Sequence, residues 1–317
     1  MIPCQVENWV RYSDCVLNDV THKTNRYGMA LSLIVGFDND RRNLLLAQAL
    51  LIDESVDSHI WMFSNIIKAT GIRPLVIITD SDPAVDAAIR QVFPTTYPIH
   101  CAFHISQNLD KNLRKALDNN YQSFLDAFYS CRNCIIEDIF QQRFDKLIED
   151  YPKAKNYLEH LYKTKTYWAH CYTKYHFTGG MISSSRVESV NACLKRLLNN
   201  SNTPLYDLMF EIQRLLDQQD KQKEYEFWRL SIPSIRRQNN TNFLFTKIDQ
   251  CLQKFLTATV LKMHRDEMNQ SLYYVANLVK QDVDTHEVNV LSNTNLSMNI
   301  CRVLIRNFNF TGRINRS

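Results

Sequence analysis

The chain has 317 residues, 45% of them hydrophobic and 22% charged, which is typical of a globular protein and excludes a disordered one. Its net charge of +4 permits nucleic-acid binding, but no block of Lys and Arg forms a basic arm. No apolar run is long enough for a membrane span, and the first residues lack the pattern of a signal peptide. The nine cysteines show no framework spacing, which indicates reduced thiols in the cytosol or nucleus.

The first third of the chain begins with three strand patterns. A short strand is expected over residues 14–20. The apolar runs Met29–Phe37 and Asn43–Ile52 are expected to form a hairpin, because turn residues separate them. Asp53 or Ser55 then caps a predicted helix. The spacing of apolar residues predicts that its inward face carries Val56, Ile60, Phe63 and Ile67.

Two further strand and helix pairs follow. The apolar run 75–79 predicts a buried strand closed by Asp80, and Asp82 before a proline predicts the start of a helix. A fifth strand is expected at Tyr97–Cys101 and a helix at about Phe103–Leu117. This order predicts an α/β protein with a mixed five-stranded sheet flanked by helices on both faces. It is the strand order of the ribonuclease H-like fold.

The remaining sequence is predicted to be helical. Residues 119–177 show no convincing strand and have aromatic residues at helical spacing, which predicts an all-α insertion. Helices are expected at about Ser184–Leu198, at 205–230 and, as a single helix, near 243–281. The predicted domains are therefore a ribonuclease H-like core at 1–118 and 178–232, the helical insertion at 119–177, and a helical or poorly ordered tail at 233–317.

Three acids distant in the sequence are the candidate site. Asp19 ends the first strand pattern, Asp80 ends the fourth, and Glu188 lies on a predicted helix. Carboxylates at the carboxyl ends of strands lie where open α/β sheets place their chemistry. Two such aspartates and a helix-borne glutamate are the ligands that a two-metal phosphoryl-transfer site needs.

The predicted helix around Glu188 has a separate polar stripe. Glu188, Asn191 and Lys195 are spaced i, i+3, i+7, away from the apolar stripe of the same helix. This places a carboxylate beside candidate contacts for a phosphate backbone, and Arg186 is a further candidate for DNA binding. Simpler roles compete: Asp19 as a turn residue, Asp82 as a helix cap and Glu188 as a solvated charge.

Two short motifs suggest metal or supporting roles. Cys101 and His104 form a C-x-x-H directly after the fifth strand pattern, and Cys131 and Cys134 form a C-x-x-C. Together they could form a zinc cluster, although structural zinc sites normally lie on short loops and both pairs here look helical. The preferred interpretation places His104 beside the acids, where it orients a carboxylate or contacts DNA.

A series of motifs in fixed order resembles the Mutator-like element (MULE) transposases, which include far-red-impaired-response-type proteins. The similarity covers about residues 10–230. The matching segments are Asn18–Tyr27, Leu50–Glu54 followed by Trp61, Ile77–Asp82, Val92–Pro94, Ile99–His104 and Ser183–Asn191.

This resemblance implies a ribonuclease H-like DDE transposase. Its catalytic and metal-binding triad would be Asp19, Asp80 and Glu188, with Cys101 and His104 as the C-x-x-H of the family. The implied cofactor is a pair of Mg²⁺ or Mn²⁺ ions, and the implied partner is DNA, as transposon ends and target, in the nucleus. No membrane is involved, and a homo-oligomer is compatible with this interpretation.

Longer family members carry an N-terminal zinc-type DNA-binding domain and a C-terminal SWIM zinc motif. Neither motif is found in this sequence, so we expect a truncated copy. The alternative function is a domesticated, non-catalytic DNA-binding regulator of transcription built on the same fold. A ribonuclease H or exonuclease is a third option, disfavoured by the size of the helical insertion.

Overall fold

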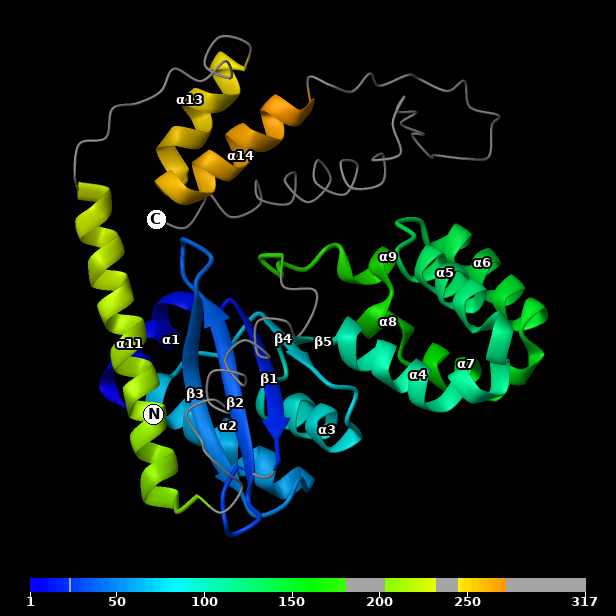
Figure 1. Ribbon diagram of the computed structural model, residues 1–317, viewed down its shortest axis with the longest axis horizontal. Coiled ribbons are helices and arrows are strands. Elements are labelled where there is room, and N and C mark those ends of the chain that lie inside the picture. Colours follow the sequence, from blue (N-terminus) through cyan, green and yellow to red (C-terminus); the bar gives the residue numbers. More distant parts are fainter. Residues whose placement is uncertain (23, 181–202, 232–244, 272–317) are drawn as a thin grey trace. The chain divides into compact units, whose positions relative to one another are not determined.

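The computed structural model describes residues 1–22, 24–180, 203–231 and 245–271 (Figure 1). The chain divides into two compact units, Met1–Asp38 with Asn43–Lys221, and Asn39–Arg42 with Gln222–Ser317. The predicted helix Ser184–Leu198, with Arg186, Glu188, Asn191 and Lys195, lies outside the described residues.

The first unit contains a five-stranded sheet of order β3-β2-β1-β4-β5. β1, β2 and β3 pair antiparallel, whereas β4 and β5 extend the sheet parallel to β1. The predicted α/β architecture with a mixed five-stranded sheet is therefore confirmed. The strands are β1 (Cys15–Thr21), β2 (Ala30–Phe37), β3 (Asn43–Leu51), β4 (Val76–Thr79) and β5 (Tyr97–His100).

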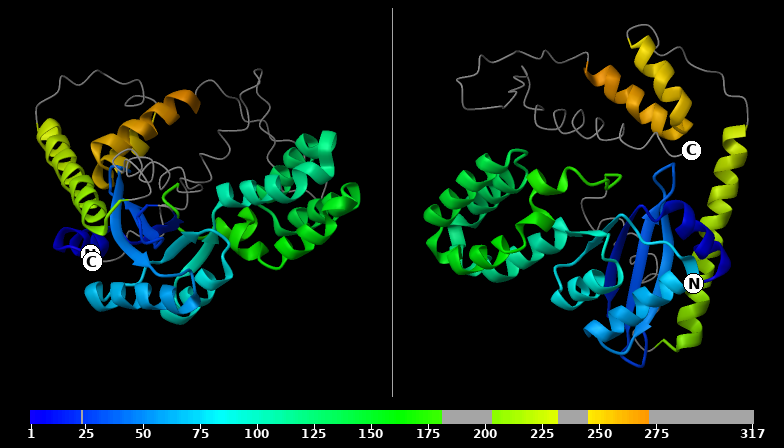
Figure 2. Two further views of the ribbon diagram at one scale, coloured as in Figure 1. Left: turned by 60° about the horizontal axis from the view of Figure 1, so that its bottom comes forward. Right: turned by 180° about the vertical axis from the view of Figure 1, so that it is seen from behind.

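One face of the sheet is covered by α1 (Pro3–Tyr12), α2 (Val56–Thr70) and α3 (Pro83–Val92). α2 and α3 lie side by side behind the strands in Figure 1 and in front of them in the right-hand view of Figure 2. Side chains that alternate along the strands supply this core, among them Val16, Ile34 and Ile77.

Two details of this face differ from the sequence prediction. α1 was not predicted; its fully buried Trp9 donates a hydrogen bond from Nε1 to the carbonyl of Ile72 at 3.0 Å. The buried face of α2 is rotated relative to the predicted one and includes His59. Phe63 is buried as predicted, while Val56, Ile60 and Ile67 are only partly buried.

The opposite face of the sheet is covered by α11 (Leu205–Ser231). Leu208, Ile212, Leu215 and Leu216 of this helix pack on the alternate set of strand residues, which includes Leu17, Leu33 and Ile78. Near the start of β3, Gln219 fixes the helix to the sheet, because its side chain accepts a hydrogen bond from Leu45 N and donates one to Asn43 O. Helices on both faces of the sheet were predicted and are found.

A helical region follows β5. α4 (Ala102–Leu117) starts directly at the end of the strand, and its buried leucines join a core of stacked aromatic rings. Phe128 and Phe140 contact Trp168 in this core, with ring centroids 5.7 and 5.8 Å apart. The other elements are η1 (Asp118–Asn120), α5 (Tyr121–Arg132), α6 (Glu137–Asp150), η2 (Pro152–Ala154), α7 (Lys155–Tyr162), α8 (Lys165–Trp168) and α9 (His170–Thr173).

In the second unit, the single helix predicted near 243–281 is wrong. Two helices are found in the described part, α13 (Thr246–Phe255) and α14 (Ala258–Ser271). Leu256 between them is extended, and the two helices are joined by a bidentate ion pair from Arg265 to Asp249 at 2.6 and 2.7 Å. No helix among the described residues is long and apolar enough to cross a membrane.

Candidate functional site

Asp19 and Asp80 occupy matching positions on neighbouring parallel strands. Leu17 of β1 is paired with Ile78 of β4, and each aspartate lies two residues beyond one member of that pair. Since side chains alternate along a strand, both carboxylates point to the sheet face that α11 covers. Neighbouring strands lie about 4.8 Å apart, so the sheet itself brings two carboxylates together.

Burial and neighbouring charges perturb the carboxyl group of Asp80. The pKa of Asp80 is raised to about 6: burial is the largest cause, the negative charges of nearby carboxylates add to it, and His104 opposes it. A carboxyl group that is partly desolvated among other carboxylates is costly to ionise unless a cation is present. Such a perturbation is typical of a functional site.

His104 lies between the acid pair and Cys101. Its Nε2 is 3.7 Å from Oδ1 of Asp19, and its interaction with the Cys101 thiol raises the pKa of the imidazole. Burial acts to raise the pKa of Cys101, but contacts with the side chain and backbone of His104 outweigh it and lower the pKa. The C-x-x-H motif therefore forms one unit that directs a ring nitrogen toward Asp19.

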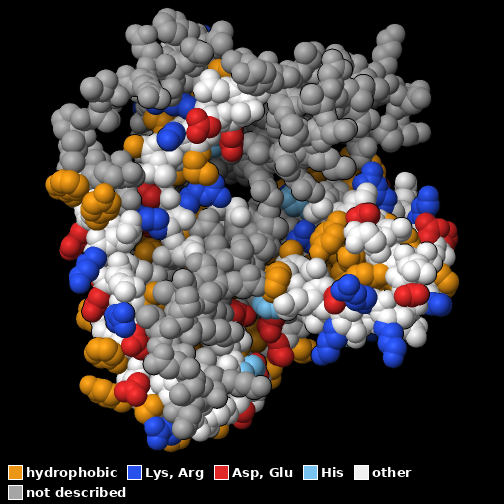
Figure 3. Space-filling model, in the orientation of Figure 1, with side chains coloured by type: hydrophobic (Ala, Val, Ile, Leu, Met, Phe, Trp, Pro, Cys, Tyr) orange, Lys and Arg blue, Asp and Glu red, His pale blue; other side chains and the backbone are white. Residues whose placement is uncertain are grey.

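A second group of polar residues lies around the pair. His22 Nε2 is 3.0 Å from Glu54 Oε1. Asp82 accepts hydrogen bonds from Ala84 N and Val85 N, which confirms that it caps α3. In Figure 3, acidic and histidine side chains gather where the sheet meets the helical region.

Asp53 lies just before α2, and the N-cap is Ser55, one of the two caps that the sequence predicted. Oδ1 of Asp53 accepts hydrogen bonds from the backbone and hydroxyl of Ser55 and from the hydroxyl of Ser58. These bonds lower the pKa of Asp53 to about 2. Its lone pairs are thus used at the helix start and not at the acid pair.

Glu54 and His22 were missed by sequence reasoning. Local sequence carries no signal for the role of Glu54: it follows from the sheet, in which β3 runs parallel to β1, so that its carboxyl end meets the same edge as Asp19. The sequence prediction assigned both Asp53 and Glu54 to the helix start. That role does not account for the charge of Glu54, which raises the pKa of Asp80.

The described residues do not form a metal site by themselves. No three His, Cys, Asp or Glu side chains among them are grouped so as to hold a metal ion. Glu188 lies outside the described residues, but the described chain before and after it contacts the end of β2 and the loop between β1 and β2. On one side Phe177 contacts Phe37, with ring centroids 6.3 Å apart, and on the other Thr203 O accepts a hydrogen bond from Arg26 N.

Cys131 and Cys134 lie in the aromatic core of the helical region. Each thiol donates to a carbonyl, Cys131 to Phe140 O and Cys134 to Ile136 O. Burial, with the neighbouring Cys134, raises the pKa of Cys131 to about 12. Within the described part of the chain, these cysteines do not combine with Cys101 and His104 into the zinc cluster that the sequence suggested.

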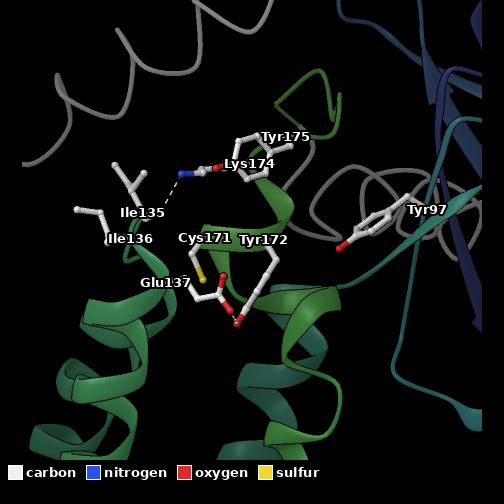
Figure 4. Close-up of a pocket in the computed structure, with 8 residues that line it drawn as sticks. All are labelled: Tyr97, Ile135, Ile136, Glu137, Cys171, Tyr172, Lys174 and Tyr175. Carbon is white, nitrogen blue, oxygen red and sulfur yellow. Dashed lines mark hydrogen bonds between the residues drawn. The ribbon is translucent and has the colours of Figure 1, made fainter. Parts of the chain in front are cut away.

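A cavity of about 350 Å³ lies between β5 and the helical region (Figure 4). The polar groups around it are already bonded to one another: Lys174 Nζ donates to Ile135 O at 2.8 Å, and Tyr172 donates to Glu137 Oε1 at 2.5 Å. Because these lining groups are bonded to one another, we do not regard the cavity as a catalytic site. It is lined by Tyr97, Ile135, Ile136, Glu137, Cys171, Tyr172, Lys174 and Tyr175.

Comparison with known families finds a match over most of the sheet. Residues 15–108, from β1 to the middle of α4, match the family model of the MULE transposase domain. This part of the chain is similar to MULE transposases. The matched region includes Asp19, Asp80, Cys101 and His104.

Several curated proteins similar to this chain come from Arabidopsis thaliana. Protein FAR1-RELATED SEQUENCE 7 is 25% identical over 84% of this chain and 33% of its own length. Protein FAR1-RELATED SEQUENCE 12 is 25% identical over 84% of this chain and 32% of its own length. Protein FAR-RED IMPAIRED RESPONSE 1 is 24% identical over 62% of this chain. The chain spans about a third of the length of the first two relatives.

Proposed function

We propose that this MULE-type domain is a DDE transposase that cleaves and transfers DNA strands with the help of divalent metal ions. The observation that carries the proposal is the placement of Asp19 and Asp80 on adjacent parallel strands, at one edge and on one face of the sheet. The order β3-β2-β1-β4-β5 supports a ribonuclease H-like fold, in which this edge is the place for such chemistry.

The donor set fits Mg²⁺ or Mn²⁺. Both ions prefer anionic oxygen ligands, and the desolvated Asp80 is a carboxylate whose ionised form a cation would stabilise. Asp19, Asp80 and Glu188 would hold two ions. When bound, the ions supply activation of the attacking hydroxyl group and neutralisation of the leaving oxygen.

The remaining site residues have positioning roles in this proposal. His104 contacts Asp19 from the start of α4 and fixes the orientation of that carboxylate. The partly buried environment of Asp80 limits its hydration. Arg186, Asn191 and Lys195 are proposed to contact the DNA backbone near Glu188. The partner is DNA, as transposon ends and target, in the nucleus, and the domain is proposed to act there as a homo-oligomer.

The test is a nicking and strand-transfer assay on DNA in Mg²⁺. Asp80→Asn and Asp19→Asn should abolish both activities, whereas Asp57→Asn, which removes an exposed carboxylate from the first turn of α2, should not. Asp80→Cys should be inactive in Mg²⁺ and regain activity in Mn²⁺, because a thiolate is a softer ligand. Equal activity of wild type and Asp80→Asn would remove Asp80 from the mechanism.

A second candidate is a non-catalytic DNA-binding regulator of transcription. It is favoured by the names of the relatives, which refer to an impaired far-red response and not to transposition. Titration calorimetry with Mg²⁺ or Mn²⁺ separates the candidates. A DDE transposase binds the ions and loses them in Asp80→Asn, whereas a regulator binds DNA equally well with either residue and shows no metal binding that depends on Asp80.

A further inference from the structure

Helix α4 presents a line of basic side chains that begins at the acid pair. Its buried stripe consists of Ile105, Leu109, Leu113 and Leu117. With about 100° between successive residues of a helix, His104, Lys111 and Lys115 fall within an arc of about 40° on the opposite side. The same side that directs His104 toward Asp19 therefore continues as two lysines along the exposed face.

The two lysines lack the partners that a solvated helix face usually provides. Lys111 and Lys115 are exposed and have no ion pair within the described ranges. Arg114, by contrast, is paired with Asp110 at 2.8 Å in the usual i, i+4 arrangement. Lys111 and Lys115 are themselves i, i+4, a like-charge spacing that weakens an isolated helix. A bound polyanion would remove this repulsion.

The spacing along the helix fits a nucleic-acid backbone. At 1.5 Å per residue, Lys111 and Lys115 lie about 10 and 16 Å along the axis from His104. Phosphates of one DNA strand follow each other every 3.4 Å of duplex axis, so these distances correspond to about three and five nucleotides. In Figure 3, Lys and Arg side chains appear over the part of the helical region where α4 lies.

We propose that Lys111 and Lys115 bind the phosphodiester backbone of the DNA whose scissile bond lies at Asp19 and Asp80. The inference rests on the proposed function and assigns α4 as the guide for the flanking DNA. Contacts to phosphates fix the position and direction of the strand and carry no base information. The contacts therefore hold for any DNA sequence.

The experiment measures binding of the full chain to a labelled DNA duplex by fluorescence anisotropy, without divalent ions, from 50 to 200 mM salt. The test variant is Lys111→Gln/Lys115→Gln. The control is Lys146→Gln/Lys163→Gln, which removes two exposed charges from α6 and from the end of α7. Circular dichroism melting checks the fold, and the test variant should melt no lower than wild type, because a like-charge pair has been removed.

Loss of two phosphate contacts makes the negative slope of log affinity against log salt shallower by about 1.8. Over this salt range wild type should therefore lose about tenfold more affinity than the test variant, and the control should behave like wild type. An equal effect in the control, or no effect in the test variant while wild type binds, overturns the inference and leaves the proposed function standing. No DNA binding by wild type overturns both. Charge-dependent binding without Asp80-dependent cleavage supports the α4 contact and counts against the transposase chemistry.

Discussion

Asp80 lies beside Asp19 on the neighbouring parallel strand, two residues beyond the paired Leu17 and Ile78. The pairing register holds the two carboxylates near each other. Because the backbone of a sheet is rigid, the cost of that proximity cannot be relaxed by moving the residues apart. This electrostatic cost contributes to the raised pKa of Asp80, which burial and the nearby carboxylates together bring to about 6.

The first prediction concerns stability without metal. A carboxyl group with a raised pKa in the folded state stabilises the fold fully below its unfolded pKa, near 4, and this stability is lost as the pH rises through about 6. Asp80→Asn should therefore increase the free energy of unfolding at pH 7.5 by about 1–2 kcal/mol in EDTA, with no gain at pH 4. Urea unfolding at both pH values measures this. Asp57→Asn, on the exposed first turn of α2, should change stability little at either pH, and a loss of stability in Asp80→Asn would contradict the desolvation argument.

The second prediction concerns the C-x-x-H unit. The contact with Cys101 is the main cause of the raised pKa of His104. Cys101→Ser should therefore lower the pKa of the His104 imidazole, because burial then acts with less opposition. Proton NMR titration of the histidines in metal-free protein measures the shift, with Cys15→Ser in β1 as a control. An unchanged His104 titration in Cys101→Ser would show that the thiol is not its partner.

The third prediction concerns Gly179, near the point where the described chain stops before Glu188. Its φ of +54° is unfavourable for other residues, and an added Cβ would lie 1.8 Å from the ring of Phe37. Gly179→Ala should destabilise the protein by about 1–3 kcal/mol. It should also reduce metal-dependent cleavage, because the segment leading to Glu188 is displaced.

Phe37→Ala and the double variant separate the two causes of this effect. Phe37→Ala alone removes packing against Phe177. In the double variant the steric clash is gone and the positive φ remains, so Gly179→Ala should cost less in the Phe37→Ala background than in wild type. Strictly additive losses in urea unfolding would show that the ring is not the obstacle.

The strands and the acid pair could be predicted because their signals are local. Short apolar runs closed by turn residues or aspartate define each strand, and strand order then determines which ends meet. The buried stripe of α2 could not be read in the same way, since His59 is fully buried there although its type suggests exposure. The influence of Glu54 on Asp80 also required the sheet, because it depends on β3 running parallel to β1.

The break between α13 and α14 shows another limit of local patterns. Neither glycine nor proline marks it, and Leu256 and Thr257 are ordinary residues in a helical pattern. The helices separate because folding back on each other buries Leu261 and brings Arg265 to Asp249. These are tertiary contacts that the helical period does not encode.

The last prediction follows from that ion pair. Hydrogen bonds from Arg265 lower the pKa of Asp249, so the pair stabilises the two-helix unit above the unfolded pKa of an aspartate, near 4, and this stability is lost as the pH falls through the lowered value. Asp249→Asn should lower the free energy needed to open α13 and α14 locally by about 1–3 kcal/mol at pH 7. Hydrogen exchange of the amides of Thr246–Ser271 in the full chain measures this. Asp266→Asn removes the same charge from an exposed site on α14 and should leave the exchange unchanged. If both variants exchange alike, net charge and not the bidentate contact holds the two helices together.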